Sequence, residues 1–311
     1  EFEGSANISV LSAKAMVQGP IPRGSYLISA RRTYFDQIFK NTQYDLPYYF
    51  YDFQGKINFD LNENHRLTLS GFYGDDKLDY DIASEDDADE DFNVGIDWLW
   101  GNRTTSLKWR WLIHPDIYSE VWLTRSNFRL NLDLNIDATN PASLDIDNGI
   151  LDRSIKADFN YFGIDNHSIK FGASQSWLDF KYAFALNNYQ LFDYQTKPAL
   201  TAVYAQDQWQ LSNLFSVRAG ARLEHYSLGN YTKFSPRIGF KYRLTHNLAL
   251  KGSFGLYHQF LTTASSDDQN FSFIDLWFPL TKQYDPLSAT HYVGGFEWWL
   301  PGDFTFSGEV Y

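Results

Sequence analysis

The sequence of 311 residues contains no cysteine, and none of its apolar runs reaches the roughly 18 residues that a membrane-spanning helix requires. The lack of cysteine excludes a disulfide framework and a thiolate metal site, and it leaves the cellular compartment open. The lack of long apolar runs excludes membrane helices. It does not exclude a transmembrane β-barrel, because only every second residue of a barrel strand faces lipid.

Basic residues are outnumbered by acidic ones, 26 against 38, and the net charge of −12 argues against a nucleic-acid-binding protein. Enzyme signatures are missing as well: there is no HExxH, no GxSxG, no phosphate-binding glycine loop and no dinucleotide-binding glycine fingerprint. We therefore predict neither catalytic residues nor a bound metal or cofactor.

What the sequence does contain is a period of two, seen most clearly in residues 202–228. Apolar residues keep one parity on each side of Ser212-Asn213, and polar residues keep the other. This pattern predicts a tight hairpin whose odd residues in 203–211 and 215–223 face lipid. Arg218, Arg222 and Glu224 are then expected to face the lumen of a barrel.

The same alternation recurs almost everywhere and predicts fourteen long strands. They cover residues 6–18, 25–36, 48–61, 66–80, 94–113, 117–136, 150–161, 167–182, 199–211, 214–227, 234–244, 247–260, 289–300 and 303–311. Strands of soluble proteins average about 5–6 residues, whereas 12 tilted residues rise about 28 Å, close to the apolar band of an outer-membrane barrel. Short connections alternate with longer polar ones, as periplasmic turns alternate with extracellular loops.

The apolar parity changes near Gly101, from even at Trp98 and Trp100 to odd at Trp109 and Trp111. A turn at Gly101-Asn102 would place two short turns in succession, so we expect a β-bulge at Gly101 within one continuous strand. The gathering of Trp and Tyr near strand ends favours interfacial girdles over ordinary core aromatics.

Two loop features allow a functional interpretation beside a structural one. The acidic run 75–91 is a solvated loop or a site for divalent cations, and it lacks the glycine that an EF-hand requires. Aromatic residues of the longest loop line a ligand-binding vestibule or pack the loop on itself. These candidate ligand-binding residues are Phe271, Phe273, Trp277, Phe278 and Tyr284.

Four stretches resemble hairpins of the TonB-dependent outer-membrane receptors, in the type common in Bacteroidota. They are SVLSAKAMVQGPIPRGSYLISARRTYFDQI (9–38), YAQDQWQLSNLFSVRAGARLEHY (204–226), FSPRIGFKYRLTHNLALKGSFGLYHQF (234–260) and DPLSATHYVGGFEWWLPGDFTFSGEVY (285–311), in the order of the family. The resemblance implies an all-β, transmembrane, antiparallel up-and-down barrel in the bacterial outer membrane. It also implies energy-coupled uptake of a scarce nutrient, such as a ferric siderophore or similar chelate, cobalamin or an oligosaccharide.

The resemblance also implies three partners: the lipid bilayer with its lipopolysaccharide, a small nutrient ligand, and the TonB complex of the inner membrane. The TonB complex would act through an N-terminal plug. The family barrel has 22 strands and an N-terminal plug, so with fourteen strands we expect residues 1–311 to be a single partial barrel domain without the plug. The sequence starts at EFEGSANISV, without a basic region followed by an apolar core, so we expect no signal peptide in it. We also expect its first and last strands, 6–18 and 303–311, not to pair with each other.

Two alternatives stay open at this point. A passive outer-membrane channel of fourteen strands fits the parity and the strand count. A soluble β-propeller or sandwich binding protein fits the β content, although such folds have shorter strands.

Overall fold

The computed structural model describes residues 1–40, 47–83, 93–137, 140–264, 276–302 and 304–311. The chain forms strands almost throughout, because its alternating sequence suits the two-residue period of β-structure. The strands are β1 (Glu3–Ile8), β2 (Ser12–Ile21), β3 (Gly24–Thr33), β4 (Tyr48–Asn62), β5 (His65–Ala83), β6 (Asn93–His114), β7 (Ile117–Asp137), β8 (Ala142–Tyr161), β9 (His167–Leu186), β10 (Tyr189–Thr196), β11 (Ala199–Gln210), β12 (Phe215–Tyr226), β13 (Tyr231–Arg243), β14 (Leu248–Gln259), β15 (Leu261–Ala264), β16 (Leu276–Pro279), β17 (Leu287–Leu300) and β18 (Phe304–Val310).

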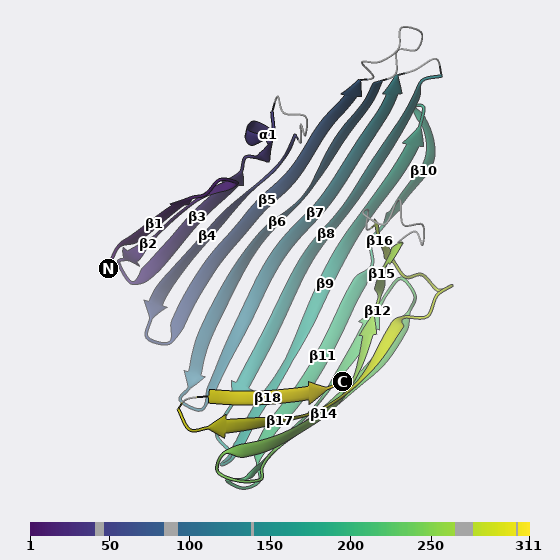
Figure 1. Cartoon of the computed structure of the whole chain (residues 1–311). Helices are drawn as coiled ribbons and strands as arrows, with labels where there is room; N and C mark the ends of the chain where they lie inside the picture. Colours follow the sequence, from purple (N-terminus) through teal and green to yellow (C-terminus); the bar gives the residue numbers. More distant parts are fainter. Residues whose placement is uncertain (41–46, 84–92, 138–139, 265–275, 303) are drawn as a thin grey trace. The chain divides into compact units, whose positions relative to one another are not determined.

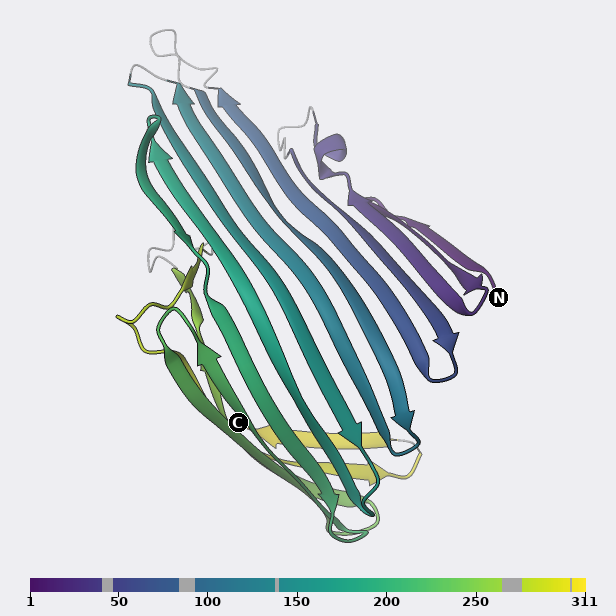
Figure 2. The ribbon, with the colours of Figure 1, turned by 180° about the vertical axis from the view of Figure 1, so that it is seen from behind.

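The strands follow an up-and-down order in one sheet of 16 strands, in which consecutive strands pair except that β9 pairs with β11 and β14 with β17 (Figure 1). The order begins at β1 and ends at β18, β10 lies off this order and pairs with β9, and β15 and β16 form a separate ribbon. The same neighbours lie side by side when the sheet is seen from behind (Figure 2). The expectation of an all-β, antiparallel up-and-down fold is confirmed.

The short helix α1 (Phe35–Ile38) follows β3. Among the described residues, no helix is both long and apolar enough to cross a membrane. The described chain divides into two compact units. Unit 1 comprises residues 1–109, 122–154 and 177–197, and unit 2 comprises residues 110–121, 155–176 and 198–311.

Within each unit the sheet has an apolar face and a polar face. In unit 1, Phe53 pairs with Tyr73 and Ile57 with Leu69, and both Phe53 and Leu69 are 47% exposed. In unit 2, Val203 pairs with Leu223, and these side chains are 50% and 44% exposed. A sheet face of exposed large apolar side chains is the outer surface of a membrane barrel and not the core of a sandwich or propeller.

The structure has 18 strands where the sequence predicts fourteen, because three segments differ from the prediction. Predicted strand 6–18 is two strands, β1 and β2, joined by a turn in which the Ser9 hydroxyl accepts a hydrogen bond from the Ser12 amide at 3.1 Å. The predicted loop 183–198 contains β10, which Asn187 and Asn188 connect to β9 with positive φ angles of 51° and 62°. The predicted loop 261–288 contains the ribbon of β15 and β16.

The expected bulge at Gly101 is also wrong. Strand β6 is continuous, as predicted, but contacts on both sides of Gly101 join odd residues to odd residues of β5: Asp97 pairs with Lys77 and Arg103 donates to the Tyr73 hydroxyl. The alternation therefore passes through Gly101 without a shift. The aromatic side chains of β6 change face along the strand. Trp100 stacks on Tyr48 on the face of the even residues, whereas Trp109 lies on the face of the odd residues.

Candidate functional site

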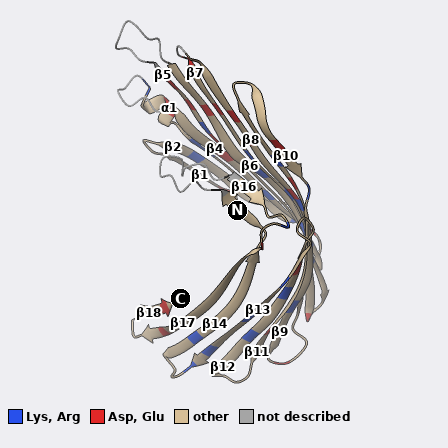
Figure 3. Ribbon diagram, turned by 90° about the vertical axis from the view of Figure 1, so that its right-hand side faces the viewer, with Lys and Arg blue, Asp and Glu red and all other residues tan. Residues whose placement is uncertain are grey.

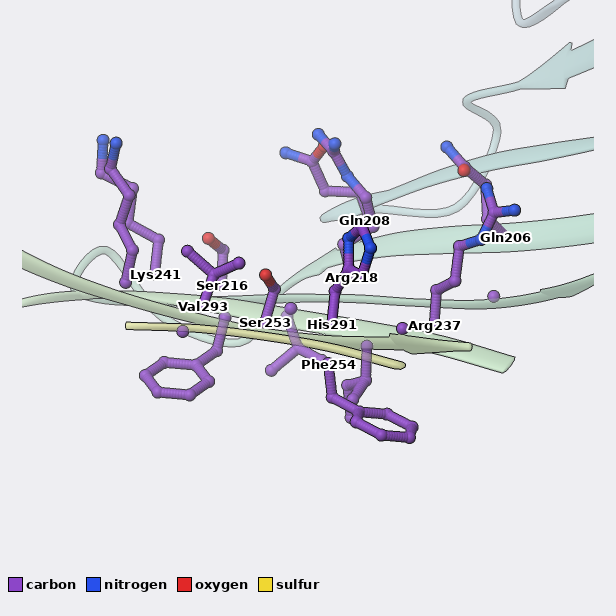
Figure 4. A pocket seen from close by; sticks show the side chains of 18 of the residues that line it. Gln206, Gln208, Ser216, Arg218, Arg237, Lys241, Ser253, Phe254, His291 and Val293 are labelled. Carbon is purple, nitrogen blue, oxygen red and sulfur yellow. The ribbon is translucent and has the colours of Figure 1, made fainter. Parts of the chain in front are cut away.

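The polar face of unit 2 is the candidate functional site. It is built by alternation along β11–β14 and β17, where Gln208 pairs with Arg218, Ser216 with Lys241, and Lys241 with Lys251. Figure 4 shows Gln208, Arg218 and Lys241 on one side of these strands and Phe254 on the other. Residues directly opposite each other in antiparallel strands point to the same face, so the pairing gathers these polar side chains.

A hollow of about 940 Å³ lies over this face, and the charged residues of its lining are mainly cations. Figure 3 shows Lys and Arg along β12, β13 and β14. The carboxylates of the lining are Glu297 and Glu309. The cations are Lys156, Lys170, Arg218, Arg222, Arg237, Lys241 and Lys251. A surface with this excess of positive groups attracts anions.

One end of the hollow is organised by a buried carboxylate. Asp158 is fully buried, with 0% of its surface exposed. Its Oδ2 lies 3.2 Å from Lys156 Nζ and 2.9 Å from Lys170 Nζ, and its Oδ1 accepts a hydrogen bond from the Tyr204 hydroxyl. The Arg222 guanidinium lies over the Tyr204 ring, 5.1 Å from its centroid. Asp158 therefore fixes two lysines and a tyrosine in place on the polar face.

Further ion pairs hold other cations of the lining. Glu297 pairs with Lys241 at 2.8 Å and with Lys251. Arg222 donates through Nε to Glu224 Oε1 at 2.8 Å. These carboxylates neutralise part of the positive charge and set the positions of the cations.

Two arginines are not neutralised in this way. Arg218 donates through Nη2 to the neutral amide oxygen of Gln208 at 2.6 Å, and Arg237 lies over the Tyr257 ring, 4.4 Å from its centroid. In the part of the chain that the structure describes, neither arginine has a carboxylate partner. Their guanidinium groups have donors left for a bound anion.

The structure places the three predicted lumen residues on one face of β12, opposite to Val217 and Leu223. Their surroundings differ. Arg218 is exposed, whereas Glu224 is 8% exposed and paired with Arg222. Glu224 therefore positions a cation and is not itself open to a ligand.

The candidate aromatic residues of the longest loop are only partly brought together. Phe271 and Phe273 lie outside the described residues. Trp277 and Phe278 are consecutive in β16, opposite Thr263 and Thr262, and so point to opposite sides of the ribbon. Tyr284 is 63% exposed, and the Tyr231 hydroxyl donates to its carbonyl oxygen at 2.9 Å.

The acidic run 75–91 lies partly in strand β5, which extends to Ala83, and its residues 84–92 lie outside the described chain. Asp75 is buried against Arg129, at 2.7 Å, and is not part of a solvated loop. The described residues contain no group of three or more His, Asp or Glu side chains that could hold a metal ion.

Sequence reasoning did not identify most of the residues that line the hollow, including Arg237 and the lysines, or the buried Asp158 beside them. The alternation was a usable signal, because Lys156 and Asp158 share a parity in β8, as Arg237 and Lys241 do in β13. The pairing register was needed to bring these strands to one place.

Comparison of whole structures gives similar receptors from Pseudomonas aeruginosa. The ferripyoverdine receptor of the outer membrane bound to ferripyoverdine has a TM-score of 0.67 at 14% identity, covering 99% of this chain and 47% of that chain. The ferric enterobactin receptor PfeA has a TM-score of 0.64 at 12% identity, covering 97% and 50%. The siderophore receptor PirA has a TM-score of 0.62 at 12% identity, covering 97% and 52%. The chain thus spans about half the length of these receptors.

A search of curated proteins by sequence found no match. The family described as "TonB dependent receptor-like, beta-barrel" matches residues 25–311. This match covers most of the chain, and the antiparallel up-and-down strands with their apolar and polar faces agree with it. The chain belongs to the TonB-dependent receptor-like β-barrel family.

Proposed function

We propose that this chain forms part of the barrel wall of an outer-membrane receptor. The receptor imports a scarce nutrient as an anionic chelate, and a ferric siderophore is the favoured class. The observation that carries the proposal is the cationic polar face within a chain of this family. The apolar face meets lipid, the polar face meets the lumen, and residues 1–311 act as one barrel domain.

The cationic face suits an anionic cargo because the guanidinium groups of Arg218 and Arg237 lack carboxylate partners within the described residues. The similar structures are receptors for ferripyoverdine and ferric enterobactin, which supports the same class of cargo. Cobalamin and an oligosaccharide are the other candidate cargoes, and neither requires a cationic wall.

The family supports the proposed partners. A plug within the barrel would be pulled by TonB of the inner membrane, and the wall would contact phospholipid and lipopolysaccharide. We propose that ligand capture uses aromatic residues of the longest loop, of which Trp277 and Tyr284 are exposed.

Equilibrium binding to the full-length receptor tests the proposal. Ferric enterobactin, ferripyoverdine, cobalamin and a neutral oligosaccharide would be titrated against the purified receptor. We expect saturable binding of a ferric chelate, weakened in a Trp277→Ala variant and unchanged in a Tyr189→Ala control, whose side chain is also exposed but lies in β10. Binding of only cobalamin or the oligosaccharide would contradict the proposed cargo.

A further inference from the structure

The apolar face of unit 1 carries a group of arginines, Arg103, Arg125, Arg129 and Arg153, which we name the outer arginine row. Side-chain contacts fix the face to which they belong. Thr104 bonds to Ser126 at 2.8 Å and Ser106 to Thr124 at 3.3 Å, so even residues of β6 and β7 share one face. By alternation, the odd residues of both strands share the other.

The odd face continues into the neighbouring strands. Arg129 of β7 pairs with Asp75 of β5 at 2.7 Å, and Asn131 of β7 donates to Asp147 of β8 at 3.3 Å. Arg153 has the same parity in β8 as Asp147. The four arginines therefore point to one side of the sheet.

That side is the one that bears exposed apolar residues. Leu107, Trp109 and Leu123 are odd residues of β6 and β7 and are 38%, 36% and 49% exposed. Arg125 follows Leu123 by one step of the alternation, and Arg103 precedes Leu107 by two steps. The row thus begins where the apolar residues end, on the side toward the long loops.

The expected height of the outer arginine row along the strands agrees with a place at the upper edge of the apolar band. Arg125 is eight residues beyond Ile117, the first residue of β7 after a short turn, and Arg129 is twelve beyond it. At about 2.3 Å of rise per tilted residue, these positions lie about 19 and 28 Å above the turn, around the upper edge of an apolar band of about 25 Å. Arginine is inexpensive at that interface and costly at the bilayer centre.

A buried carboxylate anchors one end of the row. Asp75 is 1% exposed and accepts hydrogen bonds from Arg129 at 2.7 Å and from the Tyr73 and Tyr51 hydroxyls at 2.7 and 3.0 Å. Arg103 lies over the Tyr73 ring, 4.7 Å from its centroid, and keeps 45% of its side chain exposed.

The other end of the row is not neutralised. Arg125 and Arg153 are exposed, and no ion-pair partner for either is found among the described residues. The next carboxylates of this face on β7 and β8 are Asp133, eight residues from Arg125, and Asp147, six residues from Arg153. Four guanidinium groups therefore face lipid headgroups with one carboxylate, Asp75, between them.

We propose that the outer arginine row binds the phosphate groups of lipopolysaccharide in the outer leaflet. Phosphates of a lipid headgroup lie at the level of the row, and the planar guanidinium group binds phosphate oxygens in pairs. The inference depends on the chain spanning the outer membrane and is independent of the cargo.

Native mass spectrometry of the full-length receptor tests the proposal with three probes: diphosphoryl lipid A, monophosphoryl lipid A and zwitterionic phosphatidylethanolamine. Each basic residue near a charged headgroup contributes about five-fold to affinity. We expect diphosphoryl lipid A to bind best, Arg125→Gln to weaken it about five-fold, and Arg125→Gln with Arg153→Gln to weaken it about 25-fold. Arg129 is left intact because it pairs with buried Asp75.

The matched control is Arg110→Gln, an exposed arginine of β6 with even parity, which should bind lipid A as the unaltered receptor does. Retention of the heat-resistant folded band on gels shows that each variant is folded. The proposal is overturned if the double variant binds lipid A normally, if the control loses as much, or if phosphatidylethanolamine binds as well as lipid A.

Discussion

At the scale of single residues, buried carboxylates organise exposed cations on both units. Asp158 holds Lys156 and Lys170 in unit 2, and Asp75 holds Arg129 in unit 1. In each case the acid is buried and the cations keep part of their surface exposed. Sequence alternation places such residues on a face of the sheet, but it cannot show which carboxylate is buried, because burial depends on side chains from other strands.

The Asp158 group gives a first prediction. Asp158→Asn should lower the free energy of unfolding by roughly 1–3 kcal/mol, because two lysines lose a buried partner, although their side chains are 43% and 35% exposed. Asp179→Asn should cost less than about 1 kcal/mol, since its partner Lys197 is 66% exposed. Urea unfolding in lipid vesicles measures both, and equal losses would argue against a special role of Asp158.

Gly101 gives a second prediction. A Cβ atom there would collide with Asp75 Oδ1 and lie 2.5 Å from the Gly74 carbonyl oxygen, so Gly101→Ala requires the backbone or Asp75 to move. We expect a loss of roughly 1–3 kcal/mol in the same unfolding assay. Gly294→Ala is the control, because a Cβ atom at Gly294 has nothing within 4 Å. A silent Gly101→Ala substitution would show that Asp75 is not packed against this strand.

At the scale of elements, the sequence predicted the hairpins of β11 to β14 well and the strand ends near the long loops poorly. Each of these strands has regular alternation and is bounded by a short turn. Strand β10 is absent from the prediction because Asn187-Asn188 lies in a polar stretch that reads as a loop, whereas both asparagines adopt the positive φ of a hairpin turn. The expectation of a bulge at Gly101 assumes that one face stays apolar along a whole strand. Strand β6 instead changes which face is aromatic.

The two faces of the β11–β12 hairpin can be tested directly, because the sequence has no cysteine to interfere with single-cysteine labelling. Spin labels at Val203, Val217 and Leu223 should collide with oxygen dissolved in the bilayer. Labels at Gln208 and Arg218 should collide instead with a water-soluble nickel complex. Asn213, in the turn, is the aqueous control. Loss of the two-residue alternation would disprove the membrane assignment of this hairpin.

The cationic face predicts a separation of binding from transport. Arg218 is three residues beyond Phe215, the first residue of β12 after a short turn, so it lies far from the long loops that we propose capture the ligand. Arg218→Gln with Arg237→Gln should slow uptake of a ferric chelate several-fold and leave its Kd at the cell surface unchanged. Arg110→Gln serves as control. A weaker Kd with unchanged uptake at saturation would place these arginines in the capture site instead.

At the scale of the whole molecule, the strand order ends at β1 and β18, as expected for strands that do not pair with each other. In β18, Phe304 and Val310 are 70% and 78% exposed. Unpaired strand edges are costly in lipid, where each free backbone group costs several kcal/mol. The sequence could predict these edges through its family resemblance, whereas the alternation of strand residues does not identify the proposed cargo.

The central claim, that this wall belongs to an energy-coupled importer, is tested most directly by uptake of iron-55 as a ferric siderophore into cells that carry the full-length receptor. The measurement compares cells with and without TonB, and with and without a protonophore that removes the proton-motive force. We predict accumulation only when TonB and the proton-motive force are both present, with surface binding retained in every case. Uptake that continues without TonB, in proportion to the external concentration, would contradict the account and indicate a passive channel.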